Sequence, residues 1–270
     1  MSRISDRFEM LKRDGGKGFI PFITAGDPDH DTSLSILQKL AELSADVIEM
    51  GVPFSDPMAD GPTIQLSSQR SLERGTTLQS VIDLAAEFRA ASDTPLVLFS
   101  YLNPVLRYGL DRFASAAEKA RIDGVLFTDV IEDEADAISA ILADHGIDLI
   151  SLVAPTTTDL RLQAICSNAR GFVYAVSRAG VTGARETTSD AAETLVRRIR
   201  NFSDLPIAVG FGISTRKQIA DVWRYADAAV VGSAIVERVS AAASPDEAVE
   251  AVETFVRALL PPFAKNRIDT

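Results

Sequence analysis

The stretch ADVIEMGVPFSDPMADGPTIQ, residues 45–65, places one acidic residue near the end of an apolar strand and more acidic residues directly after it. Residues 46–50 form a short apolar run that predicts a buried strand, and this run carries Glu49 close to its carboxyl end. Asp56 and Asp60 follow among closely spaced prolines and glycines, which predicts a shaped loop rather than a helix. We therefore expect Glu49 and Asp60 to face one cavity.

A purely structural interpretation of the same residues is also open. In that interpretation Glu49 ends a strand in water, and the Asp–Pro and Asp–Gly pairs only form turns. Turn chemistry explains Asp56 as well as a functional role does. For Glu49 a functional role is favoured, because an acid inside an otherwise apolar strand costs free energy unless something requires it.

Outward from this stretch, the chain repeats short apolar segments that alternate with helical patterns. The expected strands are residues 18–26, 46–51, 95–101, 124–130, 147–155, 171–176, 206–213 and 228–235. The expected helices are residues 31–44, 63–74, 77–92, 111–120, 132–145, 158–168, 190–202, 215–225 and 244–260. Near-continuous apolar strands are typical of parallel strands covered on both faces. The alternation predicts a single α/β domain, a (β/α)8 TIM barrel, with an open doubly wound sheet as the alternative.

The amino-terminal residues 1–16 do not fit this alternation. Residues 3–13, RISDRFEMLKR, have the apolar spacing of an amphipathic helix. We expect this extra N-terminal helix to cap the barrel rather than to begin a strand–helix unit.

Reactive residue types gather where the expected strands end, which is the face on which barrel enzymes carry their active sites. These strand-end residues are Glu49, Tyr101, Asn103, Asp129, Tyr174, Gly210, Phe211, Gly212, Gly232 and Ser233. For Tyr101 and Tyr174 the alternative is a core ring with its hydroxyl at the rim. For Asp129 the alternative is a cap on the following helix.

Glycine-rich segments follow three consecutive strands in the last third of the chain: GVTGARE at 180–186, GFGIS at 210–214 and GSAIV at 232–236. Glycine lets backbone N–H groups approach an oxyanion, and a helix amino end adds favourable partial charge. We therefore expect a phosphate site there, with tight turns alone as the alternative. Residues 177–189 are rich in Ser, Thr and Gly, and we expect a mobile lid in which Thr182 and Gly183 contact the ligand.

The composition narrows the class of protein. The 270 residues carry 38 acidic and 27 basic side chains, a formal charge of −11, which argues against nucleic-acid or anionic-membrane binding as the main role. No apolar run approaches the roughly 18 residues of a membrane span, and a single cysteine fits a reducing cytoplasm. Lysines avoid the strand ends and there are only two histidines, so we expect no Schiff-base chemistry, no metal and no bound organic cofactor.

The segments EMGVPFSDPMADGPTIQ, NPVLRYG, FVYAVSRAGVTGARE, GFGIST and VVGSAIV, in this order, resemble the tryptophan synthase alpha chain family. The resemblance covers nearly the whole chain, and the segment 49–65 is highly specific. It implies a barrel lyase that cleaves indole-3-glycerol phosphate to indole and glyceraldehyde 3-phosphate in L-tryptophan biosynthesis. By the same resemblance, Glu49 and Asp60 are the catalytic pair.

The resemblance also implies which residues bind the substrate and a partner. The implied indole-pocket residues are Phe22, Tyr101, Leu126, Leu152 and Tyr174, and the implied phosphate contacts are Gly183, Gly212, Gly232 and Ser233. The implied partner is a beta chain that holds pyridoxal phosphate, in an α2β2 heterotetramer, with Pro53, Asp56, Asn103 and Pro104 at the contact face. Three alternatives stay open: a related phosphate-binding barrel isomerase or synthase, a stand-alone lyase that releases indole, and a chain that mainly activates its partner.

The reaction itself suggests what the two acids would do. Breaking the carbon–carbon bond between an indole ring and a glycerol chain requires protonation of ring C3, deprotonation of a side-chain hydroxyl, and stabilisation of positive charge on the ring nitrogen. Glu49 should have a pKa raised toward the working pH by its apolar surroundings, which suits a proton shuttle. Asp60, on a polar loop, should stay ionised and hold the ring N–H.

Overall fold

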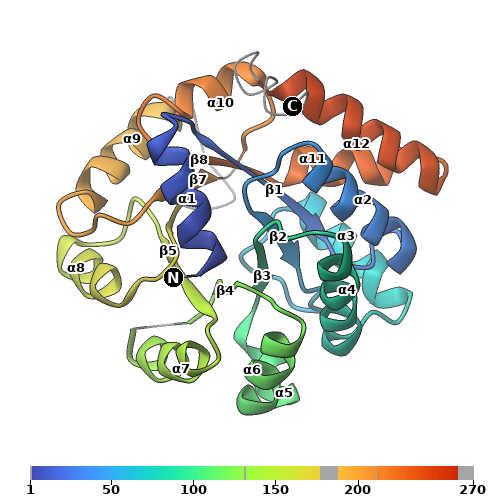
Figure 1. Cartoon of the computed structure of the whole chain (residues 1–270), viewed down its shortest axis with the longest axis horizontal. Helices are drawn as coiled ribbons and strands as arrows, with labels where there is room; N and C mark the ends of the chain where they lie inside the picture. The colour runs from blue at the N-terminus through green and yellow to red at the C-terminus, as the bar shows by residue number, and fades with distance from the viewer. Residues whose placement is uncertain (1, 131, 177–187, 211, 261–270) are drawn as a thin grey trace.

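In the computed structural model, eight parallel strands close into a barrel in chain order, and the last strand pairs with the first (Figure 1). The strands are β1 Gly18–Thr24, β2 Ile48–Gly51, β3 Leu96–Ser100, β4 Gly124–Phe127, β5 Asp148–Val153, β6 Val173–Val176, β7 Ile207–Gly210 and β8 Ala228–Val231. The structure describes residues 2–130, 132–176, 188–210 and 212–260. The predicted (β/α)8 barrel is confirmed, and the open sheet is excluded because β1 and β8 are paired.

Helices connect the strands and pack around them (Figure 1). They are α1 Arg3–Arg13, α2 His30–Glu42, α3 Pro62–Glu73, α4 Leu78–Ala91, α5 Leu102–Tyr108, α6 Leu110–Lys119, α7 Glu132–Asp144, α8 Asp159–Asn168, α9 Thr188–Ile199, α10 Arg216–Val222, α11 Ser233–Ala241 and α12 Pro245–Leu259. Helix α2 begins at an N-cap, Asp29, whose carboxylate accepts a hydrogen bond from the N–H of Thr32. Within the described ranges, none of these helices is long and apolar enough to cross a membrane.

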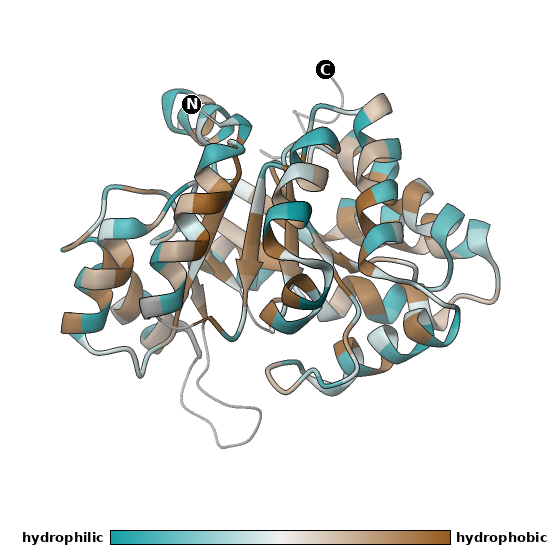
Figure 2. Cartoon of the chain, turned by 90° about the horizontal axis from the view of Figure 1, so that it is seen from below, coloured by the Kyte–Doolittle hydropathy of each residue, from teal (hydrophilic) through white to brown (hydrophobic). Residues whose placement is uncertain are grey.

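Apolar side chains form two cores, one outside the barrel and one within it. The larger core lies between the strands and the surrounding helices, and residues of α2, α4 and α12 contribute to it. The smaller core contains Phe22, Phe99, Leu126 and Tyr174 from four different strands. Figure 2 shows the hydrophobic colour concentrated on the strands, with hydrophilic residues on the outer surfaces of the helices.

Helix α1 closes the amino end of the barrel. Its buried residues Ile4, Phe8 and Leu11 lie on one face and join the core inside the barrel. On the same helix, Arg7 pairs with the buried Asp46 at 2.7 Å between Nη2 and Oδ1. The predicted extra N-terminal helix is therefore confirmed.

Two helices differ from the sequence-based expectation. Residues 228–235 were expected to form one strand, but β8 ends at Val231 and α11 begins at Ser233. Ile235 and Val236 give a strand signal because β-branched residues favour strands, whereas packing against the barrel favours the helix here. Helix α5 was also missed. Its Pro104 lies in the first turn of the helix, where the missing N–H has no intrahelical acceptor.

Candidate active site

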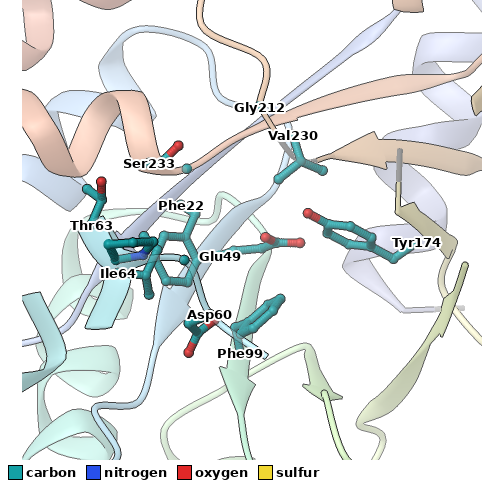
Figure 3. A pocket seen from close by; sticks show the side chains of 13 residues that line it. Phe22, Glu49, Asp60, Thr63, Ile64, Phe99, Tyr174, Gly212, Val230 and Ser233 are labelled. Carbon is teal, nitrogen blue, oxygen red and sulfur yellow. The ribbon is translucent and has the colours of Figure 1, made fainter. Parts of the chain in front are cut away.

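A cavity of about 230 Å³ at the carboxyl ends of the strands contains both acids of the 45–65 stretch. Its lining residues are Phe22, Glu49, Asp60, Gly61, Pro62, Thr63, Ile64, Phe99, Tyr174, Gly212, Val230, Gly232 and Ser233. Figure 3 shows both acids among the side chains that line the cavity; Glu49 comes from β2 and Asp60 from the loop between β2 and α3. The two acids therefore share one cavity, as the sequence predicts.

Glu49 is held in the barrel by strand pairing on both sides. In β2 it lies between Phe22 of β1 and Val97 of β3 in the register of the sheet. The residue is 1% exposed, and its Oε1 has no hydrogen-bond partner among the described residues. Burial disfavours the charged carboxylate and raises the pKa of Glu49 to about 8. The carboxyl group is therefore protonated at neutral pH and has a proton to give.

Asp60 lies on the loop between β2 and α3 and is only partly buried. Burial raises its pKa to about 6, and a hydrogen bond from Tyr101 opposes part of that increase. The loop is thus less polar around this carboxylate than the sequence suggests. The pKa of Asp60 still lies below neutrality, so the group is mostly ionised at pH 7 while Glu49 is mostly protonated.

Tyr101 does not line the cavity, contrary to what the resemblance implies. Its hydroxyl donates a hydrogen bond to Oδ2 of Asp60 at 3.1 Å and accepts one from the N–H of Ala59 at 2.8 Å. Its ring packs against Phe54, with 5.1 Å between the ring centroids. Tyr101 therefore holds the loop that carries Asp60 instead of forming the wall of the cavity.

Tyr174 does line the cavity, and Gly210 makes room for it. Figure 3 shows the Tyr174 hydroxyl directed toward the carboxyl group of Glu49. A Cβ atom on Gly210 would lie 2.0 Å from the hydroxyl oxygen of Tyr174, so any side chain there would displace the ring. Gly210 itself is not a lining residue, and its part in the site is to leave this space.

Leu126 and Leu152 are also absent from the cavity lining, so the implied indole contacts at these two residues are not supported by the geometry. Leu126 is fully buried in the core within the barrel. Leu152 lines a different cavity, which lies against α7 and α8. Phe22 and Tyr174 remain as lining residues of the expected set.

Phe99 and Val230 also line the cavity, and neither is among the residues expected there. Phe99 lies two residues after Val97, which pairs with Glu49, so the twofold alternation along β3 directs both side chains inward. That alternation is the signal that was available in the sequence. Residues 61–64 were missed because they follow Asp60 directly and look like the beginning of an ordinary helix.

The expected phosphate contacts Gly212, Gly232 and Ser233 lie together on the lining of the cavity. Gly212 has φ of +77°, a conformation that glycine adopts without strain. Ser233 is the first residue of α11, so the amino end of that helix faces the cavity. Thr182, Gly183 and Phe211, with most of the expected lid 177–189, lie outside the described residues.

The residues expected at a partner interface lie on the β2–α3 loop and on α5. Asp56 and Asn103 are exposed, Pro104 is half-buried, and Pro53 is buried. Pro53 therefore offers little surface of its own and shapes the loop instead. Two large apolar side chains lie nearby in the sequence, Met58 at 87% and Leu106 at 55% exposure. In the described part of the chain, no group of three His, Cys, Asp or Glu side chains is arranged to hold a metal ion.

Comparison with known proteins agrees with this geometry. The sequence matches the family described as Tryptophan synthase alpha chain over residues 8–261. The chain belongs to the tryptophan synthase alpha chain family. It is therefore a lyase that cleaves indole-3-glycerol phosphate in tryptophan biosynthesis, and a beta chain is the partner that the family implies.

Individual relatives of this alpha chain family align along nearly their whole length. The tryptophan synthase alpha chain of Acidiphilium cryptum (strain JF-5) is 48% identical over 265 residues, 96% of each chain. That of Caulobacter sp. (strain K31) is 51% identical over 248 residues, 92% of this chain and 90% of the relative. The solved alpha subunit of Legionella pneumophila str. Paris is 34% identical, with a TM-score of 0.87 over 100% of this chain and 99% of that one. Tryptophan synthase from M. tuberculosis, in an aminoacrylate-bound form, gives a TM-score of 0.86 at 34% identity over 96% and 98% of the two chains.

Proposed function

We propose that Glu49 and Asp60 are the acid–base pair with which this chain cleaves indole-3-glycerol phosphate. The observation that supports the proposal is the buried carboxyl group of Glu49, which shares a cavity with Asp60 and has an oxygen without a hydrogen-bond partner among the described residues. An unpaired buried polar group costs free energy, so its presence at the mouth of a stable barrel points to chemistry.

The pKa values of the two acids give them different protonation states. Burial raises the pKa of Glu49 to about 8 and that of Asp60 to about 6. Between these two values Glu49 carries a proton and Asp60 carries a negative charge. Two carboxyl groups whose surroundings separate their pKa values in this way can serve as acid and as charge stabiliser in one reaction.

The proposed reaction begins when protonated Glu49 gives its proton to C3 of the indole ring. The ring becomes a cation, and ionised Asp60 accepts a hydrogen bond from the ring N–H and stabilises the positive charge on nitrogen. The Glu49 carboxylate then takes the proton of the hydroxyl on the adjacent side-chain carbon. As that hydroxyl becomes a carbonyl, the carbon–carbon bond breaks, and its electron pair returns to the ring. The products are indole and glyceraldehyde 3-phosphate, and Glu49 is protonated again.

The opposite side of the cavity is where we place the phosphate. Gly212, Gly232 and Ser233 line the cavity with no side chain or a small one, so a phosphate can approach their backbone groups. The amino end of α11 supplies favourable partial charge for an anion. The aromatic rings of Phe22, Phe99 and Tyr174 provide apolar surface for the indole. The expected contacts from Thr182 and Gly183 belong to the same proposal.

We further propose that this chain works with a beta chain that holds pyridoxal phosphate, in an α2β2 assembly. Exposed Asp56 and Asn103 support this, because they lie on the loop that carries Asp60 and on the helix that follows Tyr101. A partner bound there would contact the same segment that positions the catalytic carboxylate. Indole release measured with and without the beta chain separates this arrangement from a stand-alone lyase, for which added beta chain leaves the rate unchanged.

Glu49→Gln and Asp60→Asn test the catalytic proposal. Each substitution keeps the size of the side chain and removes its acid–base function, and each group is expected to account for roughly 10²–10⁴-fold in rate. We expect Glu49→Gln to abolish cleavage while calorimetry still detects substrate binding. For the unmodified chain, the rate should rise with pH as Asp60 ionises near 6 and fall as Glu49 loses its proton near 8. Normal turnover by Glu49→Gln would refute the assignment.

A further inference from the structure

Helix α3 follows Asp60 directly and is attached to the end of β1 by polar contacts on one of its faces. Arg70 donates two hydrogen bonds to Asp27, Nε to Oδ1 at 2.8 Å and Nη2 to Oδ2 at 2.7 Å. The hydroxyl of Ser71 donates to the carbonyl oxygen of Ala25 at 2.6 Å, and the hydroxyls of Ser67 and Thr24 lie 2.7 Å apart. Positions 70 and 71 lie on the same side of the helix as position 67, because they follow it by three and four residues.

Hydrophobic burial alone does not account for the position of this helix, because its Ile64 packs against the core within the barrel but is only partly buried. Its buried residues are the three serines Ser67, Ser68 and Ser71, and its Leu66 is 55% exposed. Serine side chains bring too little apolar area out of water to fix a helix against a strand. The placement of α3 therefore depends on its polar contacts as well as on Ile64. The bidentate pair of Arg70 and Asp27 is the most directional of these contacts, because a planar guanidinium matches both oxygens of a carboxylate.

The position of α3 in turn sets one wall of the active-site cavity. Thr63 and Ile64, in its first turn, line the cavity together with Gly61 and Pro62. Asp60 is joined to the same turn, because the side-chain amide of Gln65 donates to the Asp60 carbonyl oxygen at 2.9 Å. A displacement of α3 would move the catalytic carboxylate and the wall beside it as a unit.

We propose that Arg70 and Asp27 are positioning residues for the cleavage reaction, since their ion pair holds α3 on β1 and thereby holds Asp60 at its working distance from Glu49. Neither side chain lines the cavity, so both act through the helix. The proposal rests on the catalytic roles of Glu49 and Asp60 given above. The catalytic roles of Glu49 and Asp60 do not by themselves require Arg70. The proposal adds that the side chain of Arg70, ten positions after Asp60, controls the rate.

Loosening α3 would leave a signature beyond lost stability. Water would reach Asp60 and Glu49, and because burial is what raises both pKa values, both would fall toward their ordinary range. The ionisable groups beside them are Tyr101 and Tyr174, whose pKa values burial raises further above neutrality, so both phenols stay uncharged. The bell-shaped dependence of rate on pH should then move to lower pH as a whole.

The molecule contains a closely matched ion pair at the other end of the barrel. Arg7 pairs with Asp46 at 2.7 Å, with side chains 26% and 0% exposed. Arg70 pairs with Asp27 at the same distance, with side chains 37% and 3% exposed. Arg7 belongs to α1, which closes the amino end, and is not one of the residues that line the cavity. Arg7→Gln is therefore the control for Arg70→Gln.

The experiment measures kcat, KM and the pH dependence of kcat for both variants, together with their thermal midpoints. We expect both to lose stability, but only Arg70→Gln to lose kcat, by roughly 10–100-fold, because small misplacement of a catalytic group is costly. Its pH optimum should lie below that of the unmodified chain. Asp27→Asn should behave like Arg70→Gln, and the double variant should be no slower than either single one. Arg70→Lys, which keeps the charge, should recover part of the rate.

The outcomes separate this proposal from the one on which it rests. If Arg70→Gln and Arg7→Gln keep the same kcat and pH optimum as the unmodified chain while Asp60→Asn is inactive, the ion pair is only structural and the positioning role is overturned. If Asp60→Asn turns over normally, the catalytic assignment itself fails. Should Arg70→Gln not fold, Arg70→Lys and Asp27→Asn carry the same comparison, and an unshifted pH optimum in both would overturn the proposal.

Discussion

The two ends of the barrel both bury carboxyl groups, but they surround them differently. At the amino end, Asp123 accepts hydrogen bonds from the N–H of Leu96 and from the guanidinium groups of Arg89 and Arg3. At the carboxyl end, Glu49 is buried with one oxygen that has no partner among the described residues. A buried carboxyl group that hydrogen-bond donors surround can stay ionised, whereas burial without such donors raises the pKa of Glu49 to about 8.

The amino end uses the same arrangement three times. In each case an aspartate lies just before one strand. Its carboxylate accepts a hydrogen bond from a backbone N–H near the start of the preceding strand, and it also pairs with an arginine. The aspartates and their N–H donors are Asp46 with Phe19 at 2.7 Å, Asp123 with Leu96 at 2.8 Å, and Asp227 with Ile207 at 2.8 Å. The arginines are Arg7, Arg89 and Arg200. These contacts tie neighbouring strands together on the side of the barrel away from the cavity.

Breaking one of these amino-end contacts should have the largest effect on stability. Asp123→Ala leaves the guanidinium of Arg89, a side chain that is 3% exposed, buried without its carboxylate. We expect the free energy of unfolding, measured with urea at pH 7, to fall by about 3–5 kcal/mol. The kcat of the folded variant should stay unchanged, because Asp123 lies at the end of the barrel opposite the cavity.

A neighbouring surface pair is the control for this change. Asp93 bonds to Arg121 at 3.0 Å, but the two side chains are 83% and 52% exposed. Asp93→Ala should leave the unfolding free energy nearly unchanged, since solvent screens exposed ion pairs. Equal effects of the two substitutions, or a large loss of kcat in Asp123→Ala, would remove the contrast between the two ends of the barrel.

At the carboxyl end, removing the buried carboxyl group should stabilise the protein as the pH rises. The pKa of Glu49 is about 8 in the folded chain and 4.5 when unperturbed, so between these values only the unfolded chain loses the proton. The unmodified protein therefore loses stability as pH rises through this window, and Glu49→Gln does not undergo this loss. From pH 5 to pH 7 the variant should gain about 2–3 kcal/mol of unfolding free energy relative to the unmodified chain.

This gain should level off above about pH 8, where Glu49 is ionised in both states. Urea unfolding of both proteins at pH 5, 6, 7 and 8 measures it. Asp60 is present in both proteins, so its own titration cancels in the difference. A difference in unfolding free energy that does not change with pH would mean that Glu49 is not held protonated. Glu49 and Asp123 would then differ only in their position in the barrel.

The barrel could be predicted because each strand carries its own local signal. Apolar runs bounded by turn residues identified all eight strands, and a carboxyl group within one of these runs identified Glu49. The errors involve α5 and α11, where a proline and a pair of β-branched residues gave signals that tertiary packing overrides. The local sequence pattern was therefore sufficient to predict the barrel. It gave the wrong secondary structure where tertiary packing determines whether a segment is helix or strand.

The site was predicted less completely, because several of its contacts join distant parts of the chain. Tyr101 was expected in the wall of the cavity, but its hydroxyl reaches Asp60, 41 positions earlier. The pair of Arg70 and Asp27 spans 43 positions and has no local signature. The resemblance implies Leu126 and Leu152 as indole contacts, yet Leu126 is fully buried and Leu152 lines a different cavity. Chain order alone does not determine which of the side chains at a barrel mouth reach the opening.

The smallest expected effect comes from Tyr101→Phe, which removes one hydroxyl and keeps the ring that packs on Phe54. The hydrogen bond from this hydroxyl lowers the pKa of Asp60, so its loss should raise that pKa and move the acid limb of the pH–rate profile to higher pH. A decrease in kcat of roughly 3–10-fold is expected, consistent with one hydrogen bond to a charged group.

Tyr108→Phe is the matched control, since the Tyr108 hydroxyl bonds to Gln79 on the surface, at 2.5 Å, and should leave the profile unchanged. The direction of the shift in Tyr101→Phe is opposite to that expected for Arg70→Gln, because one change removes a donor from Asp60 and the other admits water to it. An acid limb that stays in place in Tyr101→Phe would show that the carboxylate at this end is tuned by burial alone. In that case the single hydrogen bond from Tyr101 does not lower the pKa of Asp60, unlike the expectation drawn from the several donors around Asp123.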